Sequence, residues 1–182
     1  MHLIDKILLE AVKPKFSYSF IQAIAAWQNW GASEPSVLKK LLALKVPDEF
    51  KRCDVPIYRL VGLKNINSIQ SSIGSWSKDL KICKDFLKSD WFDSMNNPEE
   101  KTAVILKVMP KPGKVIIDLD SLWSDQSFVN AIKFYEAQKK FFSEGLELGN
   151  AQKEVVYNSG TLDRNSVYLI WDLKKQKWIK NG

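Results

Sequence analysis

The chain has 182 residues, of which 45% are hydrophobic and 12% aromatic, and its 27 Lys and Arg against 21 Asp and Glu give a net charge of +6. This length and composition fit one domain with a sizeable core and exclude a disordered or low-complexity protein. No apolar run approaches the ~20 residues of a membrane-spanning helix, and the N-terminus lacks the long apolar stretch and small-residue cleavage site of a signal peptide. We therefore expect a cytoplasmic, monomeric protein without a membrane partner, folded as a single domain over residues 1–182.

The histidine and cysteine content excludes several kinds of catalysis. The chain has one histidine, His2, and two cysteines, Cys53 and Cys83. Two cysteines do not make a disulfide framework in a chain of this size, and the ligands for a zinc site are missing. A Cys–His or Ser–His pair would have to use His2, which lies near the chain end. We expect no metal, and any enzyme here must work with carboxylates, amides, hydroxyls and arginine.

The basic charge has two interpretations. A positive excess suits polyanionic partners such as a nucleotide or a nucleic acid. Many soluble proteins carry a comparable charge, and the lysines of "KVMPKPGK" and "DLKKQKW" are scattered along the chain. The charge alone therefore identifies no nucleic-acid-binding face.

The first 50 residues have helical periodicity. "IDKILLEAV" predicts a helix that ends before Pro14, and "SYSFIQAIAAWQNWG" predicts a second one with Gly31 as its C-terminal stop. A third helix is predicted in "SEPSVLKKLLALKVP", with Ser33 as the N-cap and Pro35 in the first turn. We expect the large apolar side chains of this segment to form a core rather than an aromatic binding platform: Trp27, Trp30, Leu38, Leu41, Leu42 and Leu44.

After Pro47 the pattern changes to short strands. "VPIYRLVGL" predicts a strand that ends at Gly62, and "SSIGSWS" predicts a second extended segment. "KDLKICKDFLKS" returns to helical spacing, while "KTAVILKVMP" and "KPGKVIIDLDSL" predict two strands joined by a turn. "SDQSFVNAIKFYEAQKKFFSEG" predicts a long amphipathic helix with Ser124 as its N-cap. The segments "KEVVYNSG", "SVYLIWDL" and "KWIKNG" predict the closing strands of an antiparallel sheet, so the fold class is α+β.

Three short motifs combine residue types that suit a catalytic site. Arg59 lies on the first predicted strand, and Ser75 and Ser77 share one face of the second because strand side chains alternate. The same alternation puts Gln152 and Glu154 on one side of the entrance to a later strand, with Lys153 facing away. Each motif also has an ordinary interpretation: a surface charge for the arginine, and for Ser77 a cap of the helix beginning at Lys78.

The order of these motifs resembles that of the mono-ADP-ribosyltransferases. Arginine, then Ser-x-Ser before a helix containing a Phe, then Gln/Glu-x-Glu before a strand, is similar to the Arg–Ser–Glu branch of that family, which includes bacterial toxins and phage-encoded enzymes. The resemblance covers roughly residues 54–172, through "VPIYRLVGL", "SIGSWSKDLKICKDF", "VILKVMPKPGKVIIDLDSL" and "QKEVVYNSGTLDRNSVYLI". It implies a pair of small antiparallel sheets around an NAD cleft. Residues 1–50 would be a helical segment, and residues 51–182 the catalytic core.

The resemblance implies a role for each motif. Transfer of ADP-ribose breaks the bond between nicotinamide and ribose through an oxocarbenium-like transition state, and Glu154 would stabilise the developing positive charge. Arg59 would bind an NAD phosphate with its fork of donors. Ser75 would hold Glu154 and the nicotinamide-side ribose, and Ser77 would contribute less to NAD binding. Main-chain groups from Leu60 to Gly62 would receive the nicotinamide carboxamide.

Three further residues are assigned with alternatives. Phe86 is either an aromatic wall beside the nicotinamide or a core residue. Arginine-modifying members of the family carry Glu at the position of Gln152. A neutral amide can instead orient an amide or a nucleobase, which implies a non-arginine acceptor on a host protein or a nucleic acid. Trp76 replaces the usual Thr of the serine motif, and it either points into the core or shapes the cleft.

The sequence therefore predicts a glycosyltransferase-class enzyme that uses NAD as a co-substrate and no metal. A toxin, a phage effector acting in the host cytoplasm and a defence factor fit it equally well. The alternatives are a basic nucleic-acid-binding module and a catalytically inactive, transferase-like interaction protein.

Overall fold

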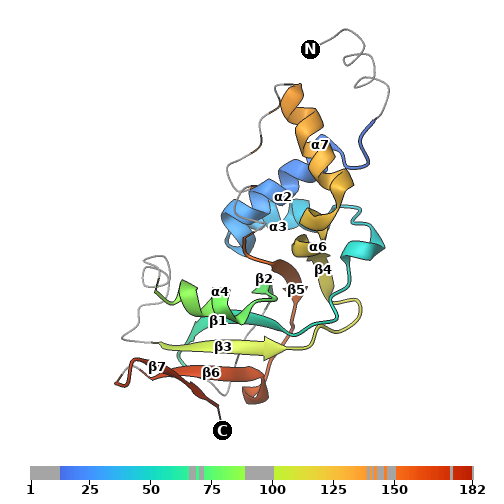
Figure 1. The fold of residues 1–182 in the computed structure, drawn as a ribbon. Helices are drawn as coiled ribbons and strands as arrows, with labels where there is room; N and C mark the ends of the chain where they lie inside the picture. The colour runs from blue at the N-terminus through green and yellow to red at the C-terminus, as the bar shows by residue number, and fades with distance from the viewer. Residues whose placement is uncertain are drawn as a thin grey trace. The chain divides into compact units, whose positions relative to one another are not determined.

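The computed structural model describes residues 13–65, 69, 72–88, 101–138, 140, 142, 146, 151–172 and 174–181. The helix predicted in "IDKILLEAV" lies outside these residues. The fold is α+β, with an N-terminal helical segment followed by a seven-stranded antiparallel sheet (Figure 1). The described residues divide into two compact units, a helical unit within 1–45 and 120–151 and a sheet unit within 46–119 and 152–182. The helical unit therefore draws on two separate stretches of the chain.

The helical unit contains α2 (Tyr18–Trp30), α3 (Pro35–Leu42), α7 (Gln126–Ala137) and all but the first residue of α6 (Leu119–Ser124). The Ser17 hydroxyl caps α2 by accepting from the backbone N–H of Phe20 at 3.2 Å. Gly31 ends α2 with a φ of 56°, a conformation that glycine adopts without the penalty of a side chain. The predicted stop at Gly31 is confirmed.

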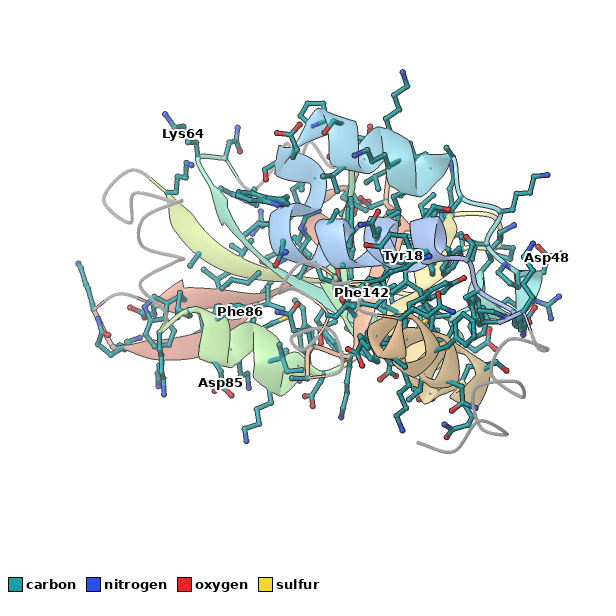
Figure 2. The ribbon with its side chains drawn as sticks, turned by 90° about the horizontal axis from the view of Figure 1, so that it is seen from above. Tyr18, Asp48, Lys64, Asp85, Phe86 and Phe142 are labelled. Atoms are coloured by element: carbon teal, nitrogen blue, oxygen red, sulfur yellow. The ribbon has the colours of Figure 1, made fainter. Side chains whose placement is uncertain are left out.

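Aromatic contacts join α2 to α7 in the core of this unit. Phe128 lies 5.4 Å from Phe16 and 5.3 Å from Trp123, measured between ring centroids. Tyr18 contacts Tyr135 at 5.5 Å and Phe142 at 5.3 Å, and Figure 2 shows Tyr18 near Phe142. The Tyr18–Tyr135 contact therefore joins α2 to α7 directly, in the edge geometry that aromatic pairs prefer, and the rings of Phe16, Trp123 and Phe142 pack around it from neighbouring segments.

Two predicted helix caps are wrong. The residue that caps α3 is Glu34, whose carboxylate accepts from the Ser36 N–H at 3.2 Å, while the Ser33 hydroxyl donates to the carbonyl of Trp30. Ser124 does not open one long helix, because it ends α6 and donates to the Asp120 carbonyl at 2.9 Å. Asp125 caps α7, accepting from the N–H groups of Ser127 and Phe128. A carboxylate is as good a cap as a hydroxyl, and its charge also suits the helix N-terminus.

The predicted helical core is confirmed only in part. Trp27 and Leu41 are each 1% exposed, whereas Trp30 and Leu42 are 63% and 48% exposed. Leu38 and Leu44 are half-buried. Trp30 and Leu42 are the last residues of their helices.

The sheet unit contains seven strands in the order β4-β5-β2-β1-β3-β6-β7, all antiparallel. The predicted strands are confirmed, and the first continues one residue past Gly62. Their bounds are β1 (Ile57–Leu63), β2 (Ile73–Ser77), β3 (Thr102–Val108), β4 (Val115–Asp118), β5 (Glu154–Asn158), β6 (Val167–Asp172) and β7 (Lys177–Lys180).

The pairing between β1 and β2 is the shortest in the sheet. These strands share a single registered pair, Tyr58 with Ser77. By contrast, β1 pairs with β3 along its whole length, from Ile57 opposite Val108 to Leu63 opposite Thr102. Likewise β2 pairs with β5 from Ile73 to Ser77. The sheet is therefore two well-paired parts, β4-β5-β2 and β1-β3-β6-β7, joined at one point.

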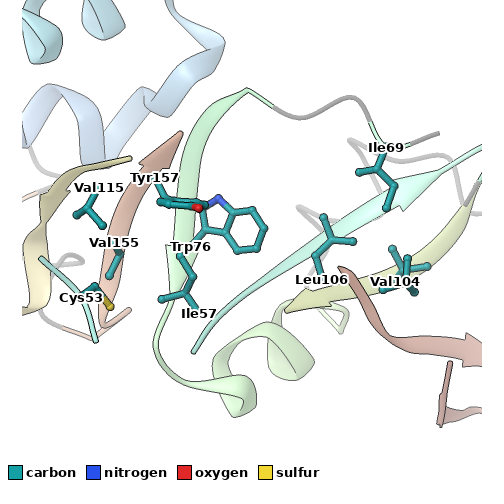
Figure 3. Close-up of a cluster of buried hydrophobic side chains, with 10 residues drawn as sticks. Cys53, Ile57, Ile69, Trp76, Val104, Leu106, Val115, Val155 and Tyr157 are labelled. Atoms are coloured by element: carbon teal, nitrogen blue, oxygen red, sulfur yellow. The ribbon is translucent and has the colours of Figure 1, made fainter. Parts of the chain in front are cut away.

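Each side of the sheet carries its own hydrophobic cluster. The larger cluster surrounds Trp76 and includes Ile57, Leu106, Val155 and Tyr157, as Figure 3 shows. The smaller cluster lies under α4 (Leu80–Phe86) and consists of Cys83, Ile105 and Leu169, with Tyr58, Leu60, Tyr168 and Trp178 packed against it. Because the two clusters use alternate residues of β1 and β3, they lie on opposite faces of these strands.

Candidate functional site

The serine and glutamate motifs lie side by side in the sheet. Ser77 on β2 is directly opposite Glu154 on β5, and Ser75 is opposite Val156. Residues opposite each other in an antiparallel pair point to the same side, and every second residue repeats that side. Ser75, Ser77 and Glu154 therefore project from one side of β2 and β5. Glu154 is 3% exposed and Ser77 is 7% exposed, while Ser75 is exposed to solvent.

Ser77 joins the end of β2 to the turn before β5. Its hydroxyl donates to the Gln152 carbonyl at 2.8 Å and accepts from the Asp79 N–H at 3.0 Å. The Lys78 N–H also donates to the Lys153 carbonyl at 3.0 Å. Ser77 does not cap the helix at Lys78, because α4 begins at Leu80. The N-cap is Asp79, which is closer to the first free N–H groups of the helix.

An ion pair supports the same junction. Lys153 lies 3.3 Å from the Asp79 carboxylate, which also accepts from the Lys81 N–H at 2.9 Å. The Lys81 N–H and then Lys153 hold the pKa of Asp79 below its usual value. The Asp79 carboxylate therefore remains ionised, caps α4 and binds Lys153 at the same time.

Gln152 lies in the turn before β5. Residues 151–153 form this turn, and Lys153 has a φ of 46°, which is outside the extended conformation of a strand. The alternation expected for Gln152, Lys153 and Glu154 is therefore wrong, because the strand begins only at Glu154. Gln152 is half-buried, and the Ser77 hydroxyl holds its main chain.

A buried ion pair lies next to this junction. The Lys78 ammonium is 2.8 Å from the Asp118 carboxylate, and the two side chains are 17% and 2% exposed. Asp118 ends β4 and is opposite Val155 on β5. Breaking a buried pair leaves an uncompensated charge, so this contact fixes the end of β2 to β4 across the strand of Glu154.

The Arg59 guanidinium lies against the main chain of β2. A Cβ atom added to Gly74 would be 2.2 Å from Arg59 Nη1 and 2.6 Å from Cζ. Gly74 and Trp76 point to the side of β2 opposite to Ser75 and Ser77. The structure thus brings together Ser75, Ser77 and Glu154 on one side, and it puts the Arg59 guanidinium on the other.

The Arg59 cation is half-buried and has no counter-ion among the described residues. Burial lowers the pKa of the Arg59 guanidinium. Within the part of the chain that the structure describes, no hydrogen bond or ion pair of Arg59 is found. A cation that has lost part of its hydration gains from an anionic partner, so this position favours a bound anion.

Trp76 belongs to the core. It is 2% exposed and contacts Tyr157 edge-to-face, with 5.9 Å between ring centroids (Figure 3). Its indole Nε1–H is the one buried side-chain polar atom among the described residues that has no hydrogen-bond partner. Of the two alternatives for Trp76, burial in the core is confirmed.

The remaining predicted residues lie on β1 and α4. Gly62 is half-buried in β1 opposite Ala103, two residues after Leu60. Phe86 is the last residue of α4 and is half-buried; Figure 2 shows it beside Asp85 on that helix.

Sequence reasoning missed Gly74 and the Lys78–Asp118 pair. A glycine inside a strand pattern signals close approach of another group, and "SIGSW" carries that signal for Gly74. Nothing in the sequence links Lys78 to Asp118, which are distant in the chain and come from different elements.

The described residues contain no group of three or more His, Cys, Asp or Glu that could hold a metal ion. Nor is any helix in the described ranges both long and apolar enough to span a membrane. Cys53 and Cys83 are buried free thiols.

Comparisons with known proteins found no relative. No protein-family model, no curated protein and no solved structure matches the chain.

Proposed function

We propose that this protein is an NAD-dependent mono-ADP-ribosyltransferase that modifies a macromolecular acceptor at a group other than arginine. One observation carries the proposal. The Ser-x-Ser strand and the strand that begins at Glu154 are direct neighbours, with Ser77 opposite Glu154. The hydrogen bond from Ser77 to Gln152 joins residues 75 positions apart in the chain. Two of the three motifs that suggest this activity, the serine and the glutamate motifs, thus form a spatial cluster.

The chemistry of the cluster suits cleavage of a glycosidic bond to nicotinamide. Positive charge develops at the anomeric carbon in the transition state. A buried carboxylate stabilises such charge more strongly than one in water, because the local dielectric is low. Glu154 would supply that carboxylate, and the exposed Ser75 hydroxyl beside it would bind the ribose.

Arg59 supports the proposal as the phosphate-binding residue. Its guanidinium has no anionic partner among the described residues, and the absent side chain at Gly74 leaves room for it. Because Arg59 and Glu154 lie on opposite sides of β2, NAD would have to extend past the place where β1 and β2 diverge. The single pair between these strands is compatible with the two small sheets that the family resemblance implies.

The neutral Gln152 supports a non-arginine acceptor. It precedes Glu154 by two residues and lies in a turn that Ser77 and Lys78 hold in place. An amide offers one acceptor and two donors, so it can orient an amide or a nucleobase without adding negative charge.

The test is Glu154→Gln, with the exposed Glu136→Gln as a matched control that makes the same chemical change outside the cluster. Each protein is incubated with labelled NAD and a cell lysate, and label is measured separately in the protein and nucleic-acid fractions. We expect the Glu154 variant to lose at least about a hundredfold in rate and Glu136→Gln to retain the wild-type rate. Circular dichroism checks that both variants are folded.

Two results would contradict the proposal. A folded Glu154→Gln variant that transfers ADP-ribose at the wild-type rate would remove Glu154 from the mechanism. A folded wild-type protein that leaves NAD intact, with no label in either fraction, would favour the interaction-protein alternative.

A further inference from the structure

Four aromatic side chains form a row on the face of the sheet that carries α4. Tyr58 on β1 lies 6.0 Å from Tyr168 on β6, and Trp171 on β6 lies 5.3 Å from Trp178 on β7, measured between ring centroids. Trp171 and Trp178 are directly opposite each other, so they project from the same face. All four residues are half-buried.

Two lysines lie on the same face of the sheet as these aromatic side chains. The Lys107 ammonium lies 4.9 Å from the centroid of the Tyr168 ring, and Lys107 is opposite Tyr58 in the register of β1 with β3. Lys180 is exposed and opposite Leu169, a member of the cluster under α4, so it shares the face of Trp178. We call Tyr58, Tyr168, Trp171, Trp178, Lys107 and Lys180 the aromatic–lysine surface.

The strand residues of this surface carry charge of one sign, and the nearest carboxylates on its face belong to α4 and its cap, Asp85 and Asp79. The described strand residues that share its face on β1, β3, β6 and β7 include no carboxylate, by strand alternation. The nearest acidic strand residue is Asp172, which follows Trp171 and therefore points to the other face. Its carboxylate is 3.6 Å from Lys175. Lys107 and Lys180 are thus left to attract an anion from outside the sheet.

Of the described helices of the sheet unit, α4 is the one on this face, and it lies alongside β1 (Figure 1). Tyr168 and Trp178 pack against the cluster that α4 covers, while β6 and β7 carry the row further toward the sheet edge. The aromatic–lysine surface therefore continues past the helix to the last strand.

We propose that the aromatic–lysine surface binds single-stranded nucleic acid. Unpaired bases stack on aromatic rings whatever their sequence, while lysines beside the rings neutralise the backbone phosphates. A duplex already stacks its bases internally, so it would use the lysines and not the rings. An acidic peptide would likewise leave the rings without a function. Binding does not depend on NAD, so this proposal stands or falls separately from the transferase.

The test measures binding of a fluorescent single-stranded oligonucleotide by anisotropy, without NAD, over a series of salt concentrations. Lys180→Glu removes a cation from the surface. Lys177→Glu makes the same change three residues earlier, on an exposed residue that faces the other side of β7. We expect Lys180→Glu to weaken binding about tenfold or more and to reduce the salt dependence, while Lys177→Glu changes binding less than about threefold.

The aromatic part is tested at Trp178. Loss of one stacking ring is expected to weaken binding about 5- to 150-fold, so Trp178→Ala should show such a loss. Trp178→Phe keeps a ring and should retain most of the affinity. Trp178 also packs against the Cys83 cluster, so the Phe variant separates stacking from stability if the Ala variant unfolds.

Controls with other ligands decide which partner the surface takes. An abasic phosphodiester strand of equal length should bind at least about tenfold more weakly than the normal strand, because it has the charge without the bases. Equal affinity for both strands, or for heparin, would overturn the stacking role. If Lys180→Glu and Lys177→Glu weaken oligonucleotide binding equally, binding does not take place at the aromatic–lysine surface. No binding at low salt would overturn the proposal entirely.

Discussion

At the scale of single residues, Gly74 controls the position of Arg59. We expect Gly74→Ala to weaken NAD binding about tenfold or more, because the new Cβ would occupy the place of the Arg59 guanidinium. Isothermal titration with NAD measures the effect. The clash involves the far end of a flexible side chain, and alanine is less costly than glycine in a strand, so the melting temperature should change little.

A double-mutant cycle provides the control for Gly74. If Gly74→Ala acts through Arg59, it should have no further effect on NAD binding in an Arg59→Ala background. Additive losses of affinity would show that Gly74 acts independently of the guanidinium.

Cys83 gives a prediction about pH. Burial raises the pKa of the Cys83 thiol from 9.0 to about 12. In the unfolded chain this thiol loses its proton near its ordinary pKa, while the folded protein keeps it. Stability is therefore complete below pH 9 and falls as the pH rises toward 12. Denaturant unfolding of wild type and Cys83→Val over this range should show a steeper decline for wild type.

Thiol labelling provides a second measurement for Cys83. At pH 8 a disulfide reagent should label neither Cys53 nor Cys83 in the folded protein and both after unfolding, because only exposed thiolates react. Rapid labelling of the native protein would contradict the burial of these thiols.

At the scale of elements, the Lys78–Asp118 pair joins the end of β2 to β4 around the strand of Glu154. Asp118→Ala should lower the free energy of unfolding by roughly 3–5 kcal/mol, because it removes the carboxylate that lies 2.8 Å from the largely buried Lys78 ammonium. Urea unfolding followed by tryptophan fluorescence measures the loss.

A double variant distinguishes the lost charge from lost packing. Lys78→Met combined with Asp118→Leu should be more stable than Asp118→Ala alone, since apolar side chains replace both members of the pair. If the double variant is as unstable as the single one, the effect of Asp118 comes from its other contacts.

Local sequence patterns predicted where most helices and strands lie more accurately than they predicted the residues at which these elements begin and end. The strand that contains Arg59 follows from its run of bulky residues, and the stop at Gly31 follows from the conformational freedom of glycine; both depend only on nearby residues. The caps Glu34 and Asp125 replaced Ser33 and Ser124, because these neighbouring carboxylates accept from the first free N–H groups of α3 and α7. The turn at Lys153 was missed for a similar reason. Its positive φ accompanies the hydrogen bonds from Ser77 and Lys78, which a local pattern does not contain.

At the scale of the whole molecule, each of the two compact units is built from two separate stretches of the chain. The helical unit needs both of its stretches, because Phe128 and Tyr135 of α7 pack on Phe16 and Tyr18 near the N-terminus. A variant that begins at Val46 should therefore lose α7 and bind a hydrophobic dye, since a helix of this length is marginal alone. Hydrogen exchange should show continued protection in β1 and β3, whose pairing lies within the sheet unit.

The full-length Phe128→Ala variant is the matched control for this truncation. Its cavity should cost about 3–5 kcal/mol, with exchange increased first in α2 and α7. Retention of α7 without dye binding in the truncated protein would contradict the dependence of α7 on the N-terminal helices.

The sequence by itself determined the α+β class, the order of the described strands and of α2, α3, α4 and α7, and the residue types available for chemistry, whereas α6 lies partly in a segment predicted as a strand. Each of these depends on hydrophobic periodicity, turn residues and composition. Only the tertiary structure decided which strands are neighbours, and hence that Ser77 faces Glu154 while the Arg59 guanidinium lies against Gly74 on the other side of β2. Likewise it buried Trp27 and exposed Trp30, two residues of the same type on one helix. Burial and strand pairing depend on contacts between distant parts of the chain, which no local pattern contains.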